Sequence, residues 1–251
     1  MLEDRRARAR VRTRNPWPAA FALLLLGLVV ACSSSRRTTP FVGRSGPPVL
    51  GPDDDLPGLV LTIHEVTGGT GPNGAFRVGD VLSVRYSVAL GDGTLLDIKH
   101  LARGAVMVSG PTFNYQRVIA SQGDLVARSV SNPDGSYTYK FNTGLPETYL
   151  PPINDSPALT DGELTGQPLL SGTYTVGMEV RVDYVIDRET FRDTANATAD
   201  FLFGSATTIE RRDVVRTENC NQCHQELRAH GGNRTRVEIC LLCHTAGAED
   251  L

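Results

Sequence analysis

The chain has few cysteines, no long apolar run and no excess of basic residues, and each shortage excludes a class of protein. Its main apolar run, from Ala19 to Val30, is shorter than the roughly 20 residues that a membrane-spanning helix needs. The 25 basic and 28 acidic residues give a net charge of −3, which does not favour nucleic acid as a partner. With only five cysteines, the chain could form at most two disulfides.

The first residues predict an export signal followed by a lipid attachment site. Six arginines within the first 14 residues precede the apolar run, as in the charged start of a secretory signal. The run ends in Val29-Val30-Ala31-Cys32, which looks like a bacterial lipoprotein cleavage box. We expect cleavage after residue 31 and a lipid on Cys32; the alternative is an ordinary signal peptide with an incidental cysteine. Removing residues 1–31 would leave 19 basic and 26 acidic residues, a net charge of −7.

The middle of the chain predicts a tether and then a β domain. Residues 32–57 are rich in Ser, Arg, Pro and Gly, as flexible linkers are. Residues 58–210 contain short segments rich in Val, Leu, Ile, Thr and Tyr, separated by turns of Gly, Asn and Asp. No segment keeps a helical apolar stripe for long, so we expect a mainly β fold, an antiparallel β sandwich or split barrel. The strands are predicted at 59–66, 81–90, 105–108, 125–130, 137–141, 173–187 and 199–203.

Two copies of Cys-x-x-Cys-His lie in the last part of the chain, residues 211–251. They comprise Cys220, Cys223 and His224, and Cys240, Cys243 and His244. This spacing is typical of covalent c-type haem attachment, in which two thiols bind one porphyrin and the histidine becomes the proximal iron ligand. The sequence therefore predicts two haem c groups and one-electron transfer in a loop-rich dihaem segment with short helices.

Two other interpretations use the same cysteines. Cys223 and Cys240 are separated by 16 residues, which also suits a zinc ribbon. Two disulfides in an exported protein are a third possibility. Neither requires a histidine directly after the second cysteine of each pair, and this histidine occurs twice, so the haem interpretation is favoured.

Three further histidines are candidates for a distal haem ligand. His230 stands at the end of a short predicted helix, before Gly231 and Gly232, and we expect it to ligate the second haem or a haem beyond residue 251. The alternative is a helix-capping role. His64 and His100 lie on the polar side of a strand and in a charged turn, so both are interpreted as surface residues, with distal ligation as the alternative.

The remaining polar residues predict no conventional catalytic site. Serines, carboxylates and histidines are scattered through the β region, so whether the chain is an enzyme stays open. Asn-x-Thr triplets begin at Asn196 and Asn233, but glycosylation is not expected in a bacterial protein.

The haem segment resembles the first two haem sites of the OmcA/MtrC family of outer-membrane decahaem cytochromes, in the pattern Cys220-x-x-Cys223-His224-x-x-Leu227-x-x-His230-Gly231-Gly232-x-Arg234 and then Cys240-x-x-Cys243-His244. The resemblance implies an N-terminal β domain followed by a multihaem domain. It also implies a cell-surface position, electron export to metal oxides or flavins, and a porin-embedded periplasmic cytochrome as donor.

The count of histidines favours a part of a longer cytochrome. Two bis-histidine haems need four imidazoles, and residues 219–251 contain three histidines. We therefore expect a cell-surface lipoprotein that transfers electrons and is a fragment of a larger multihaem chain. The alternatives are a docking or adhesion lipoprotein with accessory haems, a haem reductase with an open iron site, and an exported lipoprotein with a zinc ribbon.

Overall fold

The computed structural model describes residues 45–151 and 162–246, which contain two four-stranded antiparallel sheets. The first sheet has the order β1-β2-β6-β5, and the second has the order β4-β3-β7-β8. The mainly β fold with few short helices, predicted from the sequence, is confirmed. In the first sheet the strands are β1 (Leu59–Thr67), β2 (Ser83–Leu90), β5 (Val130–Ser131) and β6 (Tyr137–Lys140). In the second they are β3 (Arg103–Gly110), β4 (Gln116–Gln122), β7 (Gly172–Ile186) and β8 (Glu189–Phe203).

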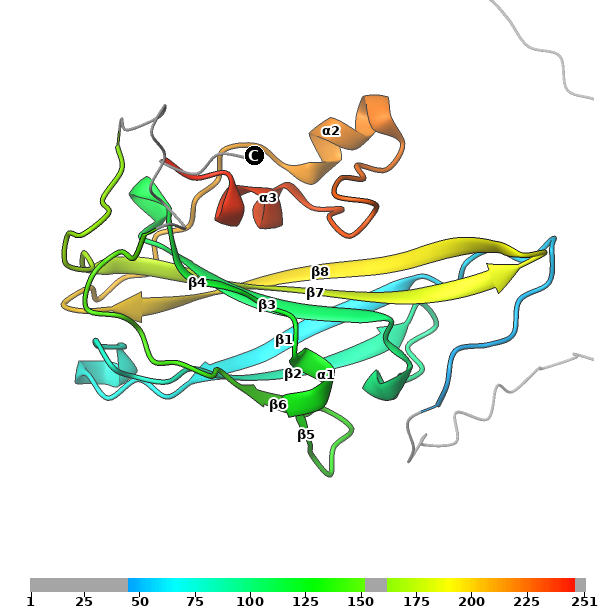
Figure 1. The fold of residues 1–251 in the computed structure, drawn as a ribbon, viewed down its shortest axis with the longest axis horizontal. Coiled ribbons are helices and arrows are strands. Elements are labelled where there is room, and N and C mark those ends of the chain that lie inside the picture. Colours follow the sequence, from blue (N-terminus) through cyan, green and yellow to red (C-terminus); the bar gives the residue numbers. More distant parts are fainter. Residues whose placement is uncertain (1–44, 152–161, 247–251) are drawn as a thin grey trace, which may run out of the picture. The chain divides into compact units, whose positions relative to one another are not determined.

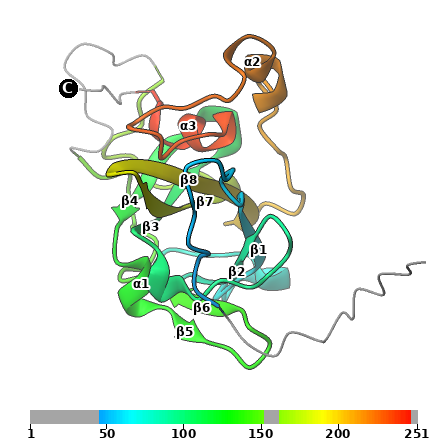
Figure 2. The ribbon, with the colours of Figure 1, turned by 90° about the vertical axis from the view of Figure 1, so that its right-hand side faces the viewer.

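Three short helices and three 3-10 turns complete the described part. The helices are α1 (Leu125–Arg128), α2 (Thr217–His224) and α3 (Val237–Cys243). The 3-10 turns are η1 (Pro72–Gly74), η2 (Ile98–His100) and η3 (Thr112–Asn114). Figures 1 and 2 show α2 and α3 on one side of the β7–β8 sheet and the first sheet on the other side.

The core lies between the two sheets because strand side chains alternate between a buried and an exposed face. β2 alternates without interruption, with Val84, Tyr86, Val88 and Leu90 buried. Several buried tyrosines have hydrogen-bonding partners for their hydroxyls: Tyr139 Oη, for example, lies 2.7 Å from both Gln122 Oε1 and Asp124 Oδ1, and its one hydrogen can be donated to either acceptor. The core therefore combines apolar rings with hydroxyls that are mostly hydrogen-bonded, the buried Tyr184 hydroxyl being an exception among the described residues.

β7 and β8 are the longest strands of the described fold and form a hairpin. The face of this hairpin that is turned away from the first sheet contacts α3. Its two strands pair over 15 residues each, from Gly172↔Phe203 to Ile186↔Glu189. The two-residue turn is formed by Asp187 and Arg188, whose φ angles of 49° and 73° are left-handed, as in the tight turns that match strand twist.

One predicted strand is wrong, one strand was missed, and β8 begins ten residues before the strand predicted at 199–203. Residues 125–128 form the helix α1, because a short apolar run does not by itself distinguish a strand from a helical turn. Its Leu125 is fully buried, and Arg128 pairs with Asp124 at 3.6 Å, four residues earlier. β4 was missed because its pairing with β3 contains register shifts, which interrupt the alternation of apolar residues.

The segment before β1 lies against the β body from Ser45 onward. Ser45 bridges to Leu96 and donates its N–H to Leu95 O at 3.0 Å, and Leu50 and Leu56 are partly buried against the core. The predicted boundaries at residues 31, 57 and 210 stay predictions. Cys32 and the export signal lie outside the described residues. Within the described ranges, no helix is long and apolar enough to cross a membrane.

Candidate haem-binding site

The first Cys-x-x-Cys-His motif forms the C-terminal part of α2. Cys220 and Cys223 are three residues apart on a helix and therefore share one face, with Cys223 exposed and Cys220 half-buried. The helix ends after His224, because Gln225 has a φ of 58°. Asn221, inside the motif, accepts a hydrogen bond from Leu227 N–H at 2.7 Å. This bond folds the following segment back onto the motif.

The second motif forms most of α3, and the helix is anchored to the outer face of the second sheet. Ile239 and Leu242 are fully buried there, in a cluster with Met107 and Tyr115. A side chain at Gly177 of β7 would collide with Leu242, so glycine at this position lets α3 lie flat on the sheet. Ser109 Oγ donates to Leu242 O at 2.6 Å. α3 is therefore held by apolar contacts and by a buried hydrogen bond.

The two cysteines of α3 lie at the edge of this packed surface. Both are half-buried, and Cys243 Sγ is 3.4 Å from Met107 Sδ. Burial raises the pKa of the Cys240 thiol, which favours its protonated form. His244 caps the helix and donates its backbone N–H to Cys240 O at 2.9 Å.

A buried threonine ties the starts of the two motif helices together. Thr217 Oγ1 accepts from Val237 N–H and donates to Glu238 Oε2, each at 3.0 Å. Thr217 begins α2 and Val237 begins α3, so one hydroxyl connects the first turns of both helices. The two Cys-x-x-Cys-His segments are thus built as one unit.

The structure brings His230 beside His244. Their ring centroids are 5.9 Å apart and the ring planes are inclined by 39°. Imidazole–metal bonds are about 2 Å long, so two imidazoles on opposite sides of one iron have ring centroids about 6 Å apart. The spacing of these two histidines therefore fits an iron held between them.

The turn that carries His230 has an unusual backbone. His230, Gly231 and Gly232 have φ angles of 51°, 68° and 83°, all in the left-handed region. The two glycines adopt this conformation without a steric penalty, and histidine is among the other residues that tolerate it. The bridge between Ala229 and Arg234 closes the turn. The reversal of the chain directs His230 back toward α3.

His64 and His100 lie in the β body. His64 is on β1, and its Nε2 is 2.8 Å from Ser87 Oγ of β2. His100 ends η2, where its ring lies beside Gly46. Both positions agree with the default interpretation as surface residues of the β domain, and distal ligation by either stays a prediction.

The zinc-ribbon and disulfide alternatives stay predictions of the sequence. Across residues 45–151 and 162–246, no three His, Cys, Asp or Glu side chains are grouped to hold a metal ion by themselves. The four motif cysteines are not joined in disulfides. The ligation of haem by the motif residues stays a prediction here.

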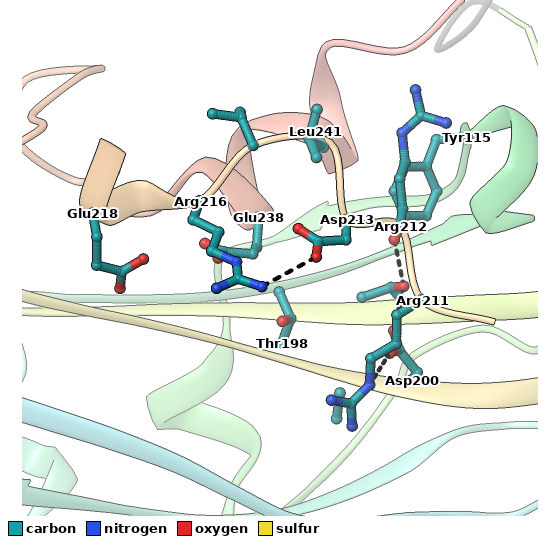
Figure 3. Close-up of a pocket in the computed structure, with 13 residues that line it drawn as sticks. Tyr115, Thr198, Asp200, Arg211, Arg212, Asp213, Arg216, Glu218, Glu238 and Leu241 are labelled. Atoms are coloured by element: carbon teal, nitrogen blue, oxygen red, sulfur yellow. Dashed lines mark hydrogen bonds and ion pairs between the residues drawn. The ribbon is translucent and has the colours of Figure 1, made fainter. Parts of the chain in front are cut away.

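A cavity of about 460 Å³ lies between β8, α3 and the segment that enters α2 (Figure 3). The sequence analysis did not predict this cavity. The charged run Arg211-Arg212-Asp213, which lies shortly before the first motif, was the available indication. Arg211 pairs with Asp200 at 3.4 Å, and Arg216 pairs with Asp213 at 3.7 Å. Since Glu218 and Glu238 also line the cavity, its four carboxylates outnumber its three arginines, and the cavity is not an evident anion site.

Tyr115 links the cavity to the anchor of α3. Its hydroxyl is 2.6 Å from Thr175 Oγ1, which in turn donates to Asp200 Oδ1 at 2.7 Å. Burial raises the pKa of Tyr115 to about 12, so the phenol stays neutral at physiological pH. The guanidinium of Arg212 lies 5.7 Å from the centre of the Tyr115 ring and donates to Thr112 O at 3.1 Å. These contacts fasten the segment before α2 to the sheet.

Two Cys-x-x-Cys-His helices, of which α3 packs on an antiparallel β body, indicate a multihaem c-type cytochrome. Residues 212–250 match the family model described as outer membrane cytochrome MtrC/MtrF-like, domains II/IV. The chain is 34% identical over 123 residues to multiheme cytochrome MtrC of Shewanella baltica (strain OS185), a match that covers 47% of this chain. These matches confirm the resemblance to the OmcA/MtrC family of cytochromes.

The match covers only part of that relative. The chain spans 16% of the length of the Shewanella baltica cytochrome. The crystal structure of MtrC from Shewanella baltica OS185 aligns with a TM-score of 0.49 and 22% identity, over 77% of this chain and 30% of that chain.

Proposed function

We propose that this chain is the β domain and first haem segment of a cell-surface multihaem c-type cytochrome that transfers electrons to extracellular acceptors. The observation that carries the proposal is the pair of Cys-x-x-Cys-His helices, tied to each other and to one sheet, with His230 and His244 only 5.9 Å apart. The similarity of residues 212–250 to MtrC/MtrF-like domains supports it.

Each motif residue has a proposed role. Cys220 and Cys223 would bind the first haem c through thioether bonds, with His224 as its proximal ligand. Cys240 and Cys243 would bind the second haem c, with His244 as its proximal ligand and His230 as its distal ligand. The bound iron supplies one-electron chemistry between the ferric and ferrous states. Both cysteine pairs lie on helices, whose regular geometry sets the distance between the two sulfurs of a pair.

The protein's own contribution is to fix the positions of the two imidazoles, those of His230 and His244, that would ligate the second haem. α3 is immobilised by Ile239 and Leu242, both fully buried, so His244 at its end has a defined position. The left-handed turn at His230 sets the opposite imidazole. Imidazoles held in place before binding lose little conformational entropy, and His230 and His244 together would supply two imidazole ligands to the haem iron.

The proposed location is the outer surface of the outer membrane. Residues 1–31 would direct export, Cys32 would carry lipid, and residues 32–57 would connect lipid and β domain. The proposed partners are other multihaem cytochromes and a porin-type conduit as electron source, with metal oxides or flavins as acceptors. Resemblance to the family supports the outer-membrane location, the partners and the acceptors, whereas the arginine-rich start and Val29-Val30-Ala31-Cys32 support export and lipidation.

Electron transfer can be tested on the haem-loaded protein itself. We expect chemically reduced protein, mixed anaerobically with a soluble ferric chelate or an oxidised flavin, to lose its ferrous absorption with one electron delivered per haem. The matched control replaces all four motif cysteines by alanine and should show no such reaction. A haem-loaded protein that keeps its ferrous bands with every acceptor of these classes would rule out the proposed function.

Lipidation is tested by Cys32→Ala. Without the acceptor thiol, the protein should move from the membrane fraction to the soluble fraction, because stable anchoring of a lipoprotein needs its acyl chains. Immunoblots of separated fractions measure the shift, and Cys220→Ala serves as a control that removes a thiol without removing the anchor. Unchanged membrane association of Cys32→Ala would show that another feature anchors the chain.

A further inference from the structure

The loop that carries His230 is bound to the outer face of β7 and β8 by a set of polar contacts. The loop residues 231–235 contribute mostly backbone atoms, and the strands contribute side chains. Thr194 Oγ1 donates to Gly232 O at 2.9 Å, and Arg192 donates to Gly231 O. This clamp extends along β8 for five residues, from Arg192 to Asn196.

Asn196 makes the two-sided contact in this clamp. Its Nδ2 donates to Asn233 O at 3.0 Å, and its Oδ1 accepts from Thr235 N–H at 2.7 Å. Asn196 is 5% exposed, so these bonds are shielded from water and a lost partner would not be replaced by solvent. The Asn196 side-chain amide therefore hydrogen-bonds both a backbone carbonyl and a backbone N–H of the loop.

Asn233, whose backbone carbonyl is bonded to Asn196, also contacts His230 through its side chain. Its Nδ2 donates to His230 O at 2.8 Å, while its Oδ1 accepts from Arg181 Nη1 of β7 at 2.7 Å. Asn196 and Asn233, each of which begins an Asn-x-Thr triplet, thus meet at this interface. A chain of two asparagines connects β8 to the backbone of the proposed distal ligand.

A buried carboxylate holds the far end of the loop. Glu179 of β7 has a side chain only 1% exposed, and its Oε2 is 2.8 Å from Arg234 Nε. Its Oε1 is 2.8 Å from Arg103 Nε of β3. Glu179 is paired with Asn196 in the β7–β8 register, so the ion pair and the amide contact lie side by side on the sheet. A buried charge with two guanidinium partners is costly to separate, which keeps Arg234 in place.

We propose that Asn196 and Glu179 are positioning residues for His230, so that the β domain, and not the haem segment alone, determines the distal ligation of the second haem. The proposal rests on His230 being that ligand. Residues that orient a metal ligand without touching the metal typically change affinity or activity by about 10- to 100-fold when they are replaced. The clamp fits this role because it acts on the backbone on both sides of the left-handed turn.

The experiment compares Asn196→Ala with Asn132→Ala in the haem-loaded chain. Asn132 also donates two side-chain hydrogen bonds, to Ser136 Oγ and Thr138 Oγ1 at 3.0 Å, but it lies in the turn between β5 and β6 of the first sheet. We expect Asn196→Ala to keep both haems, to show a high-spin fraction in magnetic resonance spectra, and to bind carbon monoxide about tenfold faster in the ferrous state. Asn132→Ala should match the unmodified protein.

His230→Ala in the same assay separates the two ideas. If His230→Ala leaves both irons low-spin, the ligand assignment fails, and the positioning proposal fails with it. If His230→Ala gives high-spin iron while Asn196→Ala does not, the ligand assignment stands and only the positioning role is overturned.

A double variant and two milder variants complete the test. Adding Asn196→Ala to His230→Ala should change carbon monoxide binding no further, because the clamp acts through the lost imidazole. If Asn196→Ala does not fold, Thr194→Val removes one contact of the clamp and Glu179→Gln weakens the neighbouring ion pairs with Arg234 and Arg103, and each variant should raise the rate of carbon monoxide binding. Unmodified rates in both folded variants would overturn the proposal.

Discussion

Produced with a cytochrome c maturation system, the chain should carry two haem masses that survive denaturation. Each Cys-x-x-Cys-His motif lies on a short helix, so the two sulfurs of a pair share a face and can reach one porphyrin. Mass spectrometry of the denatured protein measures the attached haem, and the ferrous absorption spectrum confirms its type.

Paired variants assign each haem to its motif. Cys240→Ala with Cys243→Ala should remove one haem mass, and Cys220→Ala with Cys223→Ala should remove the other. Ile239 and Leu242 still anchor α3 in the first pair, so the β domain should unfold at nearly the same temperature. A colourless product that contains zinc would refute covalent haem and would revive the zinc-ribbon alternative.

Replacement of His230 should change one iron and leave the other as it is. Both haems should stay attached, because attachment uses only the cysteines. The iron that loses its distal imidazole should become high-spin, and its midpoint potential should shift on the order of 100 mV, since axial ligands tune haem potentials over a range of about 0.8 V. Magnetic resonance spectra and a redox titration measure the two effects.

The choice of substitution matters because His230 has a φ of 51°. Alanine at a left-handed position costs about 1 kcal/mol, whereas asparagine tolerates this conformation. His230→Asn should therefore remove the imidazole with little backbone strain, and it should reproduce the spectrum of His230→Ala. His64→Ala, which removes a histidine bonded to Ser87 in the β body, is the matched control and should leave both spectra unchanged.

Two low-spin signals in both His230 variants would reduce His230 to a structural residue of the turn. His64 or His100 would then become the better candidate for the distal ligand, and the same measurements on His64→Ala and His100→Ala would decide between them.

The local chemistry of the haem segment could be predicted from the sequence because it depends on residues close together in the chain. The spacing of Cys220, Cys223 and His224 is a property of five consecutive residues, and it needs no tertiary contact to be recognised. The strands β1, β2, β6 and β7 were also found, because alternation in an antiparallel sheet directly records which face is buried.

Tertiary structure alone decided where the haem segment lies and what holds it. Gly177, Met107 and Asn196 carry no signal of their own, yet they form the flat surface, the sulfur contact and the amide clamp beneath α3 and the His230 loop. The residues that meet are as far apart as Met107 and Cys243. Such pairings follow from the register of β3, β7 and β8 and from the close packing of α3, which are set by the sum of many contacts and not by any single motif.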